Sequence, residues 1–216
     1  MSELKKKISE TLLTFNPDKL TEVTEKSLKE GHTPLDMLDA IIFALEDIGN
    51  RFKKGELFLT HLVIAGENAK KTISEILEPI LKKTNIERKV AGRIVIGTVA
   101  GDIHDIGVSI VESMLFSSGF EIINLGNDVS TETFIKAIEK YNPDIVGLSA
   151  LLSTTLPMQK KLIDALTEHN LRDKVKVIVG GAPVTAEWAE EIGADGYAED
   201  AVEAVKVIRN LIGGAK

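Results

Sequence analysis

Hydrophobic side chains in residues 1–88 recur every three or four positions, which is the period of an amphipathic helix. One helix is predicted to begin at Thr33, Pro34 and Asp36, which supply an N-cap hydroxyl, a first-turn proline and an early acid. Asn16-Pro17 repeats this start signal. The break at Gly55 separates two apolar stripes, which are Leu35, Leu38, Ile42, Leu45 and Phe52, then Leu62, Ala65, Ala69, Ile73, Ile76 and Ile80. The spacing predicts a four-helix bundle over residues 1–88.

From residue 93 the pattern changes to short apolar runs rich in β-branched residues, each followed by a helical stretch. These runs are 93–99, 121–126, 144–150 and 175–181, and residues 195–200 supply a fifth run for an edge strand. Such alternation is typical of an α/β fold with a doubly wound, five-stranded parallel sheet. We therefore expect a second domain at 89–216, joined to the bundle through the polar, basic stretch 82–92.

The composition narrows the function classes. An apolar fraction of 44% suits a globular protein, and the net charge is −7. Residues 1–88 hold 14 Lys and Arg against 15 Asp and Glu, and the remainder holds 12 against 18, so the second domain is unsuited to nucleic acid. No signal peptide or membrane-spanning run is present, which predicts a cytoplasmic protein. The absence of cysteine excludes disulfides, thiolate metal sites and a cysteine nucleophile.

Three unusual loops follow predicted strands: "GDIHDIG" after the first, "SALLSTT" after the third and "GGAP" after the fourth. Ligands of doubly wound sheets bind where the carboxyl ends of strands meet these loops. The first loop carries His104, one of four histidines in the chain. An ordinary reading is a polar loop residue that caps the next helix.

Other known sites fit this loop poorly. A hydrolytic zinc site needs about three protein ligands, and the other histidines are scattered. Gly97, Gly101 and Gly107 do not form the dinucleotide fingerprint. A phospho-receiver domain would need an Asp and a Lys at later strand ends, where Ser149 and Gly180-Gly181 stand.

One physical reading accounts for all three loops. The imidazole of His104 can ligate a metal through one nitrogen while Asp102, two residues earlier, accepts a hydrogen bond from the other. The small residues Gly180 and Gly181 would let a flat organic group approach the backbone.

These motifs resemble a known family. "DIHDIG", the later "SAL" and the "GG" together resemble the cobalamin-binding domain of corrinoid proteins, whose motif runs D-x-H-x-x-G…S-x-L…G-G. The helical part looks like that family's cap domain. The order matches the small corrinoid proteins of methyltransferase systems and the cobalamin region of methionine synthase, and residues 171–201 look most like the methylamine type. The resemblance implies a Rossmann-like, flavodoxin-like domain that binds cobalamin or a related corrinoid, such as methylcobalamin.

The resemblance also implies roles for individual residues. His104 would be the lower axial ligand to cobalt, in the base-off, His-on state, and Asp102 would hydrogen-bond its other nitrogen. Thr155 would extend this relay, although Ser153 and Thr154 leave its position uncertain by one residue. These three residues, Asp102, His104 and Thr155, form the implied catalytic set. Further cofactor contacts would come from Gly101, Asp105, Ile106, Gly107, Ser149, Leu151, Thr154, Gly180 and Gly181.

In the cap, Phe52 and Leu59 match the residues that shield the upper face of the cofactor, although plain core packing would also explain them. His61 is expected to be a surface or inter-helix residue, and an upper-ligand role stays open. One departure is Val108-Ser109, where the family often has Lys-Asn. We expect this change to alter loop or partner contacts and to leave cofactor binding intact.

The implied function is that of a methyl carrier and not of a complete enzyme. The protein would accept a methyl group from a substrate:corrinoid methyltransferase acting on a methylated amine or betaine. It would hand the group to a second methyltransferase that serves a thiol or a folate, and a reductive activating protein would restore the cobalt. Residues 51–58 and 82–92 are candidates for hinge and docking surface. The alternatives are a corrinoid subunit of an O-demethylase for methoxylated aromatics and a non-catalytic cobalamin-binding sensor module.

Overall fold

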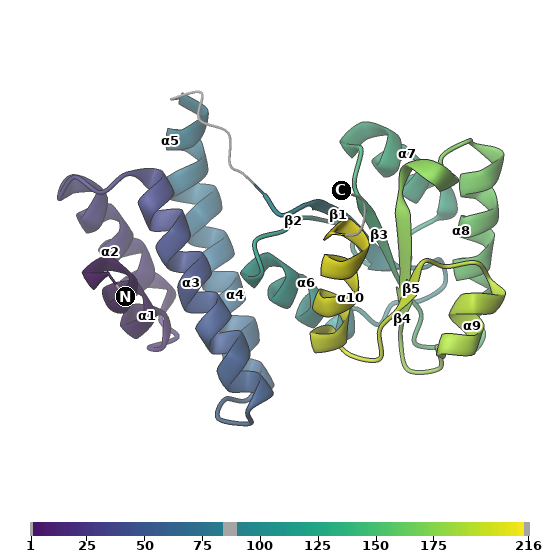
Figure 1. Ribbon diagram of the computed structural model, residues 1–216, viewed down its shortest axis with the longest axis horizontal. Helices are drawn as coiled ribbons and strands as arrows, with labels where there is room; N and C mark the ends of the chain where they lie inside the picture. Colours follow the sequence, from purple (N-terminus) through teal and green to yellow (C-terminus); the bar gives the residue numbers. More distant parts are fainter. Residues whose placement is uncertain (1, 84–89, 214–216) are drawn as a thin grey trace. The chain divides into compact units, whose positions relative to one another are not determined.

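The computed structural model describes residues 2–83 and 90–213 (Figure 1). The described residues form two compact units, one within 1–90 together with 116–119 and one within 91–115 together with 120–216. The domain boundary predicted between residues 88 and 89, and most of the predicted linker 82–92, lie outside the described residues. Within the described parts, no helix combines the length and the apolar character needed to cross a membrane.

The helical unit confirms the predicted bundle. Its elements are α1 (Glu3–Leu12), α2 (Pro17–Lys29), α3 (Pro34–Lys53) and α4 (Leu59–Thr72), which runs on through a π-helical turn (Ile73–Leu77) into α5 (Glu78–Lys83). Both predicted caps are present. The Asn16 side chain accepts hydrogen bonds from Asp18 and Lys19, and Thr33 forms a reciprocal capping box with Asp36.

The buried faces of two helices differ in part from the predicted stripes. In α3, Leu38 and Leu45 are buried as predicted, but Leu35 remains 39% exposed. In α4 the stripe holds as far as Ile73, and then Leu77 and Leu81 are buried in place of Ile76 and Ile80. A π-helical turn has one more residue than an α-helical turn, so it moves the following buried positions along by one.

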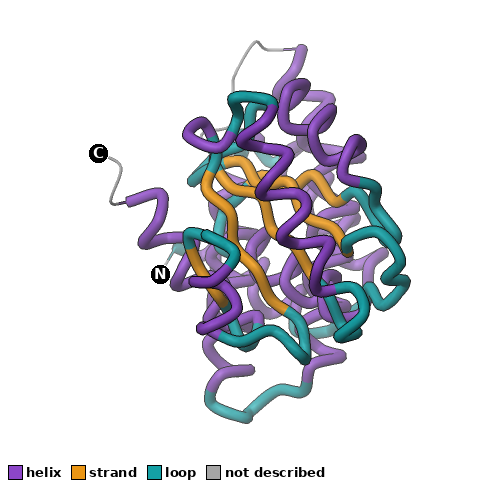
Figure 2. Tube along the Cα trace, turned by 90° about the vertical axis from the view of Figure 1, so that its right-hand side faces the viewer, coloured by secondary structure: helices purple, strands orange, loops and turns teal. Residues whose placement is uncertain are grey.

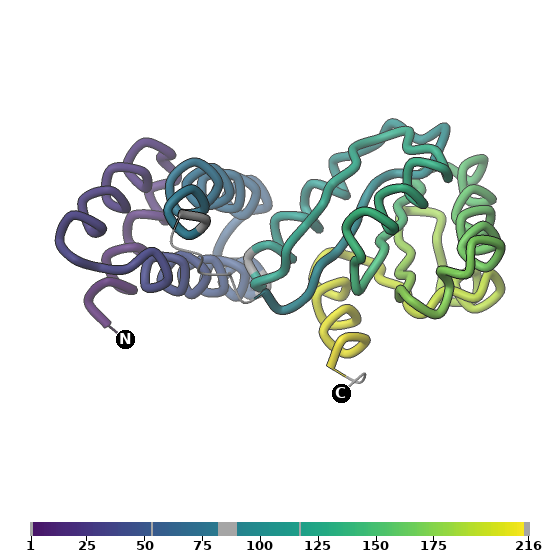
Figure 3. The backbone as a smooth tube through the Cα atoms, turned by 90° about the horizontal axis from the view of Figure 1, so that it is seen from above, coloured from purple at the N-terminus to yellow at the C-terminus, as the bar shows by residue number. Residues whose placement is uncertain are grey.

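The second unit is the predicted doubly wound sheet. All five strands are parallel, in the order β2-β1-β3-β4-β5. They are β1 (Arg93–Thr98), β2 (Glu121–Asn124), β3 (Ile145–Ser149), β4 (Lys176–Gly180) and β5 (Gly196–Tyr197). The helices are α6 (Ile106–Ser117), α7 (Thr131–Tyr141), α8 (Leu156–Glu168), α9 (Ala186–Glu191) and α10 (Ala201–Gly213). Helices α7, α8 and α9 cover one face of the sheet, and α6 and α10 cover the other (Figures 1–3).

A buried glutamine ties together the strand ends that carry two of the candidate loops. Gln159 on α8 is fully buried, and its side-chain amide donates to the carbonyls of Leu148 at 3.0 Å and Gly180 at 3.2 Å. Its own carbonyl accepts from the indole N–H of Trp188 on α9 at 3.0 Å. The carboxyl ends of β3 and β4 are therefore fixed from the side by α8 and α9.

Candidate functional site

The loop between β1 and α6 places Asp102 inside the α/β unit. Gly101 has a φ of +83°, a left-handed conformation that a glycine adopts without strain. The chain turns there, and the Asp102 backbone N–H donates to the carbonyl of Val99 at 3.1 Å. The Asp102 side chain is fully buried, so its two oxygens need hydrogen-bond donors from the protein.

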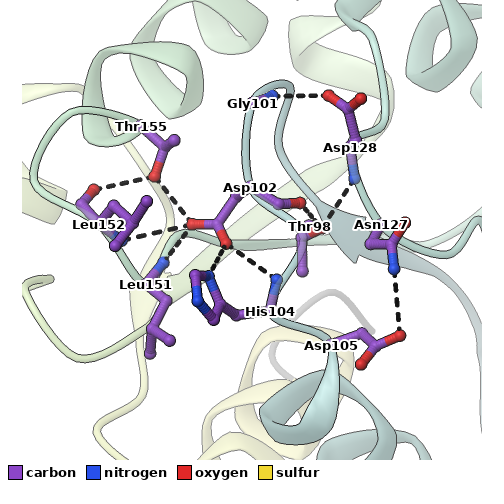
Figure 4. A network of polar contacts seen from close by, with 10 residues as sticks. All are labelled: Thr98, Gly101, Asp102, His104, Asp105, Asn127, Asp128, Leu151, Leu152 and Thr155. Atoms are coloured by element: carbon purple, nitrogen blue, oxygen red, sulfur yellow. Dashed lines mark hydrogen bonds and ion pairs between the residues drawn. The ribbon is translucent and has the colours of Figure 1, made fainter.

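One carboxylate oxygen of Asp102 holds His104. Oδ1 accepts from the backbone N–H of His104 at 3.1 Å and from its ring Nδ1 at 2.8 Å (Figure 4). A carboxylate only accepts, so Nδ1 carries the ring proton and Nε2 keeps its lone pair. The His104 side chain is 45% exposed. The result is an oriented imidazole with a basic nitrogen available to a ligand, which is the arrangement found around metal-bound histidines.

The other oxygen of Asp102 reaches the loop that follows β3. Oδ2 accepts from the backbone N–H groups of Leu151 at 2.6 Å and Leu152 at 3.3 Å. The Thr155 hydroxyl lies 2.8 Å from Oδ2 and also 2.8 Å from the carbonyl of Leu152. The hydroxyl has one proton, so it donates to one of these oxygens at a time.

The electrostatic result is a carboxylate that is ionised at neutral pH. Burial raises the pKa of Asp102, but the hydrogen bonds from Leu151 N–H, from His104 and from Thr155 outweigh it and hold the pKa far below its usual range. Asp102 therefore presents a full negative charge to the ring of His104.

Apolar side chains stand exposed around this imidazole. Ile103, directly before His104, and Ile106, the first residue of α6, are 68% and 76% exposed. Leu151 and Leu152 in the β3–α8 loop are each 41% exposed. Exposed apolar groups gathered on neighbouring loops are a common feature of ligand-binding and protein-binding surfaces. A flat, largely apolar macrocycle with a central metal fits this combination of one nitrogen donor and surrounding hydrocarbon.

Gly180, the last residue of β4, and Gly181, which follows it, are both required by the packing of the backbone. Gly181 has a φ of +125°, and a Cβ there would lie 1.9 Å from the carbonyl oxygen of Ala150. A Cβ on Gly180 would lie 3.0 Å from the carbonyl oxygen of Ala198. Close backbone approach therefore requires small residues at this strand end, and the predicted role of these glycines in lining a cofactor slot stays a prediction.

The structure separates the three hydroxyl candidates in the β3–α8 loop. Thr155 is 5% exposed and contacts Asp102, whereas Ser153 and Thr154 are exposed. Ser149 ends β3 and is half-buried. Asp105 contacts Asn127, whose side-chain amide donates to its Oδ2 at 3.2 Å.

The predicted cap residues belong to the helical unit. Phe52 is half-buried at the end of α3, and Leu59, which begins α4, is 37% exposed. The Nδ1 of His61 accepts from the backbone N–H of Phe58 at 3.0 Å, and its ring centroid lies 4.7 Å from that of Phe15. His61 thus contributes to the start of α4. Shielding of a cofactor by Phe52 and Leu59 stays a prediction.

Asp128, in the loop between β2 and α7, is a site residue that the sequence reasoning missed. Its carboxylate Oδ1 accepts from the Gly101 N–H at 2.7 Å, and its own N–H donates to the Asp102 carbonyl at 2.8 Å. The available signal was "GND", turn-forming residues that end and directly follow the predicted run 121–126, and therefore lie at the same edge of the sheet.

Comparison with known proteins finds similarity along both units. A family profile described as "B12 binding domain" matches residues 92–206, and a second with the same description matches residues 4–77. Trimethylamine corrinoid protein 1 of Methanosarcina acetivorans is 39% identical over 211 residues, which cover 97% of each chain. The dimethylamine corrinoid protein of Methanosarcina barkeri is 40% identical over 210 residues, which cover 97% of this chain and 98% of that one.

A solved structure is also similar along nearly the whole chain. The methanol:cobalamin methyltransferase complex MtaBC from Methanosarcina barkeri matches with a TM-score of 0.89 and 26% identity. The match covers 99% of this chain and 81% of that one.

Proposed function

The chain belongs to the family of B12-binding corrinoid proteins, and on this basis we propose that it carries methyl groups between two methyltransferases on a bound corrinoid. The observation that carries the proposal is the exposed His104 ring, whose Nδ1 is bound to the buried Asp102 carboxylate and whose Nε2 is available. The class of methyl donor is proposed to be a methylated amine, because the trimethylamine and dimethylamine corrinoid proteins are 39% and 40% identical to this chain.

His104 is the residue proposed to hold the cofactor through its metal. Nε2 would bind cobalt from below in place of the cofactor's own base, the base-off, His-on arrangement. When bound, the corrinoid supplies a metal that accepts a methyl group and releases it. The protein's part is to fix the direction and basicity of the imidazole, and the Asp102 contact at 2.8 Å does both.

Thr155 is proposed to tune this ligand. Its hydroxyl can donate to Oδ2 of Asp102 or to the carbonyl of Leu152, each 2.8 Å away. When it donates to Leu152, Asp102 has one donor fewer and draws the proton on His104 Nδ1 more strongly. The ring then becomes a stronger electron donor at Nε2.

The remaining predicted contacts extend the same proposal. Ser149, Leu151, Thr154, Gly180 and Gly181 would follow the nucleotide tail of the corrinoid, while Gly101, Asp105, Ile106 and Gly107 would lie near the ring. Phe52 and Leu59 of the helical unit would cover its upper face.

The proposed partners follow from the carrier role. The MtaBC structure is a complex with a methyltransferase, and this chain is proposed to bind a substrate:corrinoid methyltransferase in its turn. A second methyltransferase, specific for a thiol or a folate, would take the methyl group, and a reductive activating protein would restore the cobalt. All are proposed to meet the chain in the cytoplasm.

The ligand assignment is tested on protein labelled with 15N-histidine, by reconstitution with hydroxocobalamin, desalting, and electron paramagnetic resonance after reduction to Co(II). The cofactor's own base also carries nitrogen, as 14N, so only a 15N splitting reports a protein histidine. Wild type and the control His169→Ala, an exposed histidine of the same unit, are expected to retain stoichiometric corrinoid with the 15N splitting. His104→Ala should lose that splitting. Loss of the corrinoid from the wild type on desalting, or a 15N splitting that survives in His104→Ala, would overturn the proposal.

The donor class is tested separately, by mixing the reduced holoprotein with a methylated substrate and its methyltransferase, in three sets that supply methylamines, betaine or methoxylated aromatics. Methylation of the corrinoid, followed by its visible spectrum, is expected with the methylamine set. Methylation only with the methoxylated aromatics would instead favour the O-demethylase role, methylation only with betaine would favour a betaine system, and none with any set would favour the sensor.

A further inference from the structure

Asp128 is held in an unusual backbone conformation beside the candidate site. Its φ is +50°, in the left-handed region that only Gly, Asn and Asp enter readily. A non-glycine residue stays in this region when its surroundings determine it. The side chain is exposed, so packing into a core does not explain the conformation.

Asp128 forms hydrogen bonds to two consecutive residues of the β1–α6 loop, Gly101 and Asp102. Its Oδ1 accepts from the Gly101 N–H at 2.7 Å, while its backbone N–H donates to the Asp102 carbonyl at 2.8 Å (Figure 4). The same N–H lies 3.1 Å from the hydroxyl of Thr98, which itself donates to the Asp102 carbonyl at 2.7 Å. Two consecutive residues, Gly101 and Asp102, are thus bound from outside their own loop.

The hydrogen bonds of Asp128 act on Asp102, the residue that orients His104. The Asp102 side chain must place Oδ1 against His104 and Oδ2 against the β3–α8 loop, and its direction follows from its backbone. On the far side of His104, Asn127 donates to Asp105 at 3.2 Å. Neighbouring residues of the β2–α7 loop therefore hold the chain on both sides of His104.

We propose that Asp128 is a positioning residue for the cobalt ligand. Its carboxylate and its backbone N–H clamp the Gly101–Asp102 turn, and through Asp102 they aim Nε2 of His104 at the corrinoid. This inference rests on the proposed function. It adds Asp128 of the β2–α7 loop, a residue that acts through the backbone of Gly101 and Asp102 and not through the ring of His104 or the carboxylate of Asp102.

Two substitutions separate the hydrogen bond from the backbone conformation. Asp128→Asn keeps an acceptor oxygen and tolerates the left-handed conformation, whereas Asp128→Gly tolerates it and lacks the acceptor. Asn142→Gly is the matched control, because Asn142 has a φ of +45° at the end of α7 and is also exposed.

Three measurements are made on each protein, labelled with 15N-histidine: hydrogen exchange of the Gly101 amide without cofactor, the affinity for hydroxocobalamin, and the nitrogen splitting that 15N-histidine gives in the Co(II) form. Asp128→Gly is expected to exchange Gly101 faster, to bind about five-fold more weakly, as for one lost hydrogen bond, and to lose part of its nitrogen splitting. Asp128→Asn and Asn142→Gly should behave as wild type within about two-fold.

The outcomes distinguish this inference from the proposed function. Wild-type affinity and full nitrogen splitting in Asp128→Gly would overturn the positioning role while leaving the carrier function intact. Equal losses in Asp128→Asn and Asp128→Gly would also overturn it, because the acceptor would then not be the cause. A wild type without nitrogen splitting would instead refute the His104 ligand, which is the premise of both.

Discussion

The hydroxyl of Thr155 has a single proton, which it can donate to Asp102 or to Leu152. Substitution of Thr155 therefore tests the hydrogen-bond network around Asp102 directly. Thr155→Val preserves the side-chain shape and removes one donor to a buried carboxylate. We expect the variant to retain corrinoid, to lose about 1 kcal/mol of unfolding free energy, and to change the Co(II) spectrum. Denaturant unfolding without cofactor and the spectrum of the holoprotein measure the two effects.

Thr154→Val is the matched control for this prediction, because Thr154 is the exposed neighbour. It should stay within about 0.5 kcal/mol of wild type. Thr155→Ser should restore the wild-type spectrum. If Thr154→Val and Thr155→Val behave alike, the relay hydroxyl is misassigned.

A second residue-scale prediction concerns the glycine after β4. Gly181→Ala would place a Cβ 1.9 Å from the backbone oxygen of Ala150, at a φ of +125°. Gly101→Ala meets only an ordinary contact, 3.6 Å from a methyl group of Thr155, at a φ of +83°. We expect losses of more than about 2 kcal/mol for the first and about 1 kcal/mol for the second, by urea unfolding. Equal losses would show that the loop around Ala150 moves freely.

The sequence predicted some members of the site and missed others for a physical reason. Asp102 and His104 are two residues apart, so their partnership is local and legible in "DIHD". Asp128 binds backbone groups 26 and 27 positions away. Because nearly every residue has the same backbone groups, the sequence does not show which of them Asp128 binds. The choice of Thr155 over Thr154 likewise depended on the start of α8, which turns only Thr155 inward.

At the scale of elements, the capping box of α3 carries a prediction for the helical unit. Thr33→Ala removes the hydroxyl that accepts from the Asp36 N–H and donates to the Asp36 carboxylate. The expected cost is about 1 kcal/mol of unfolding free energy at neutral pH. Thr60→Ala, at an exposed position of α4 and not at its N-cap, is the control and should have little effect.

The capping box of Thr33 and Asp36 also determines how the stability of the helical unit changes with pH. The Thr33 hydroxyl, and after it the Thr33 backbone N–H, donate to Asp36 and lower its pKa from the usual 3.8. A carboxyl group whose pKa is lowered on folding stabilises the fold above its usual pKa, and this contribution is lost as the pH falls through the folded value. The difference between wild type and Thr33→Ala should therefore narrow below pH about 4. A difference independent of pH would contradict the Asp36 contribution.

Element prediction succeeded where the signal is local. The β-branched runs identified four strands, residues 195–200 held the fifth, and Asn16-Pro17 and Thr33-Pro34 located the starts of α2 and α3. It failed at Ile76 and Ile80, because an α-helical period was assumed across a π-helical turn that no residue type announces. Leu35 lies in the first turn of α3, where an apolar residue can remain at the surface.

For the whole molecule, removal of the cofactor is expected to lower the thermal stability. A ligand that binds only the folded state stabilises it by about 2.7 kcal/mol at a free concentration one hundred times its Kd. We expect calorimetry to show a higher Tm for the α/β unit in the holoprotein, a lower one after removal of the corrinoid, and a smaller gain in His104→Ala. A Tm that does not change on loading would mean that the corrinoid does not bind the folded unit.

The indole of Trp188, hydrogen-bonded to the buried Gln159, gives the molecule an optical property of its own. It is the only tryptophan in the chain, and both tyrosines, Tyr141 and Tyr197, also lie beyond residue 90. Tryptophan and tyrosine fluorescence therefore comes from the α/β unit alone, and the helical unit contributes none of it. Fluorescence would follow the melting of one unit while far-ultraviolet circular dichroism follows both, so the two traces separate whenever the units unfold independently.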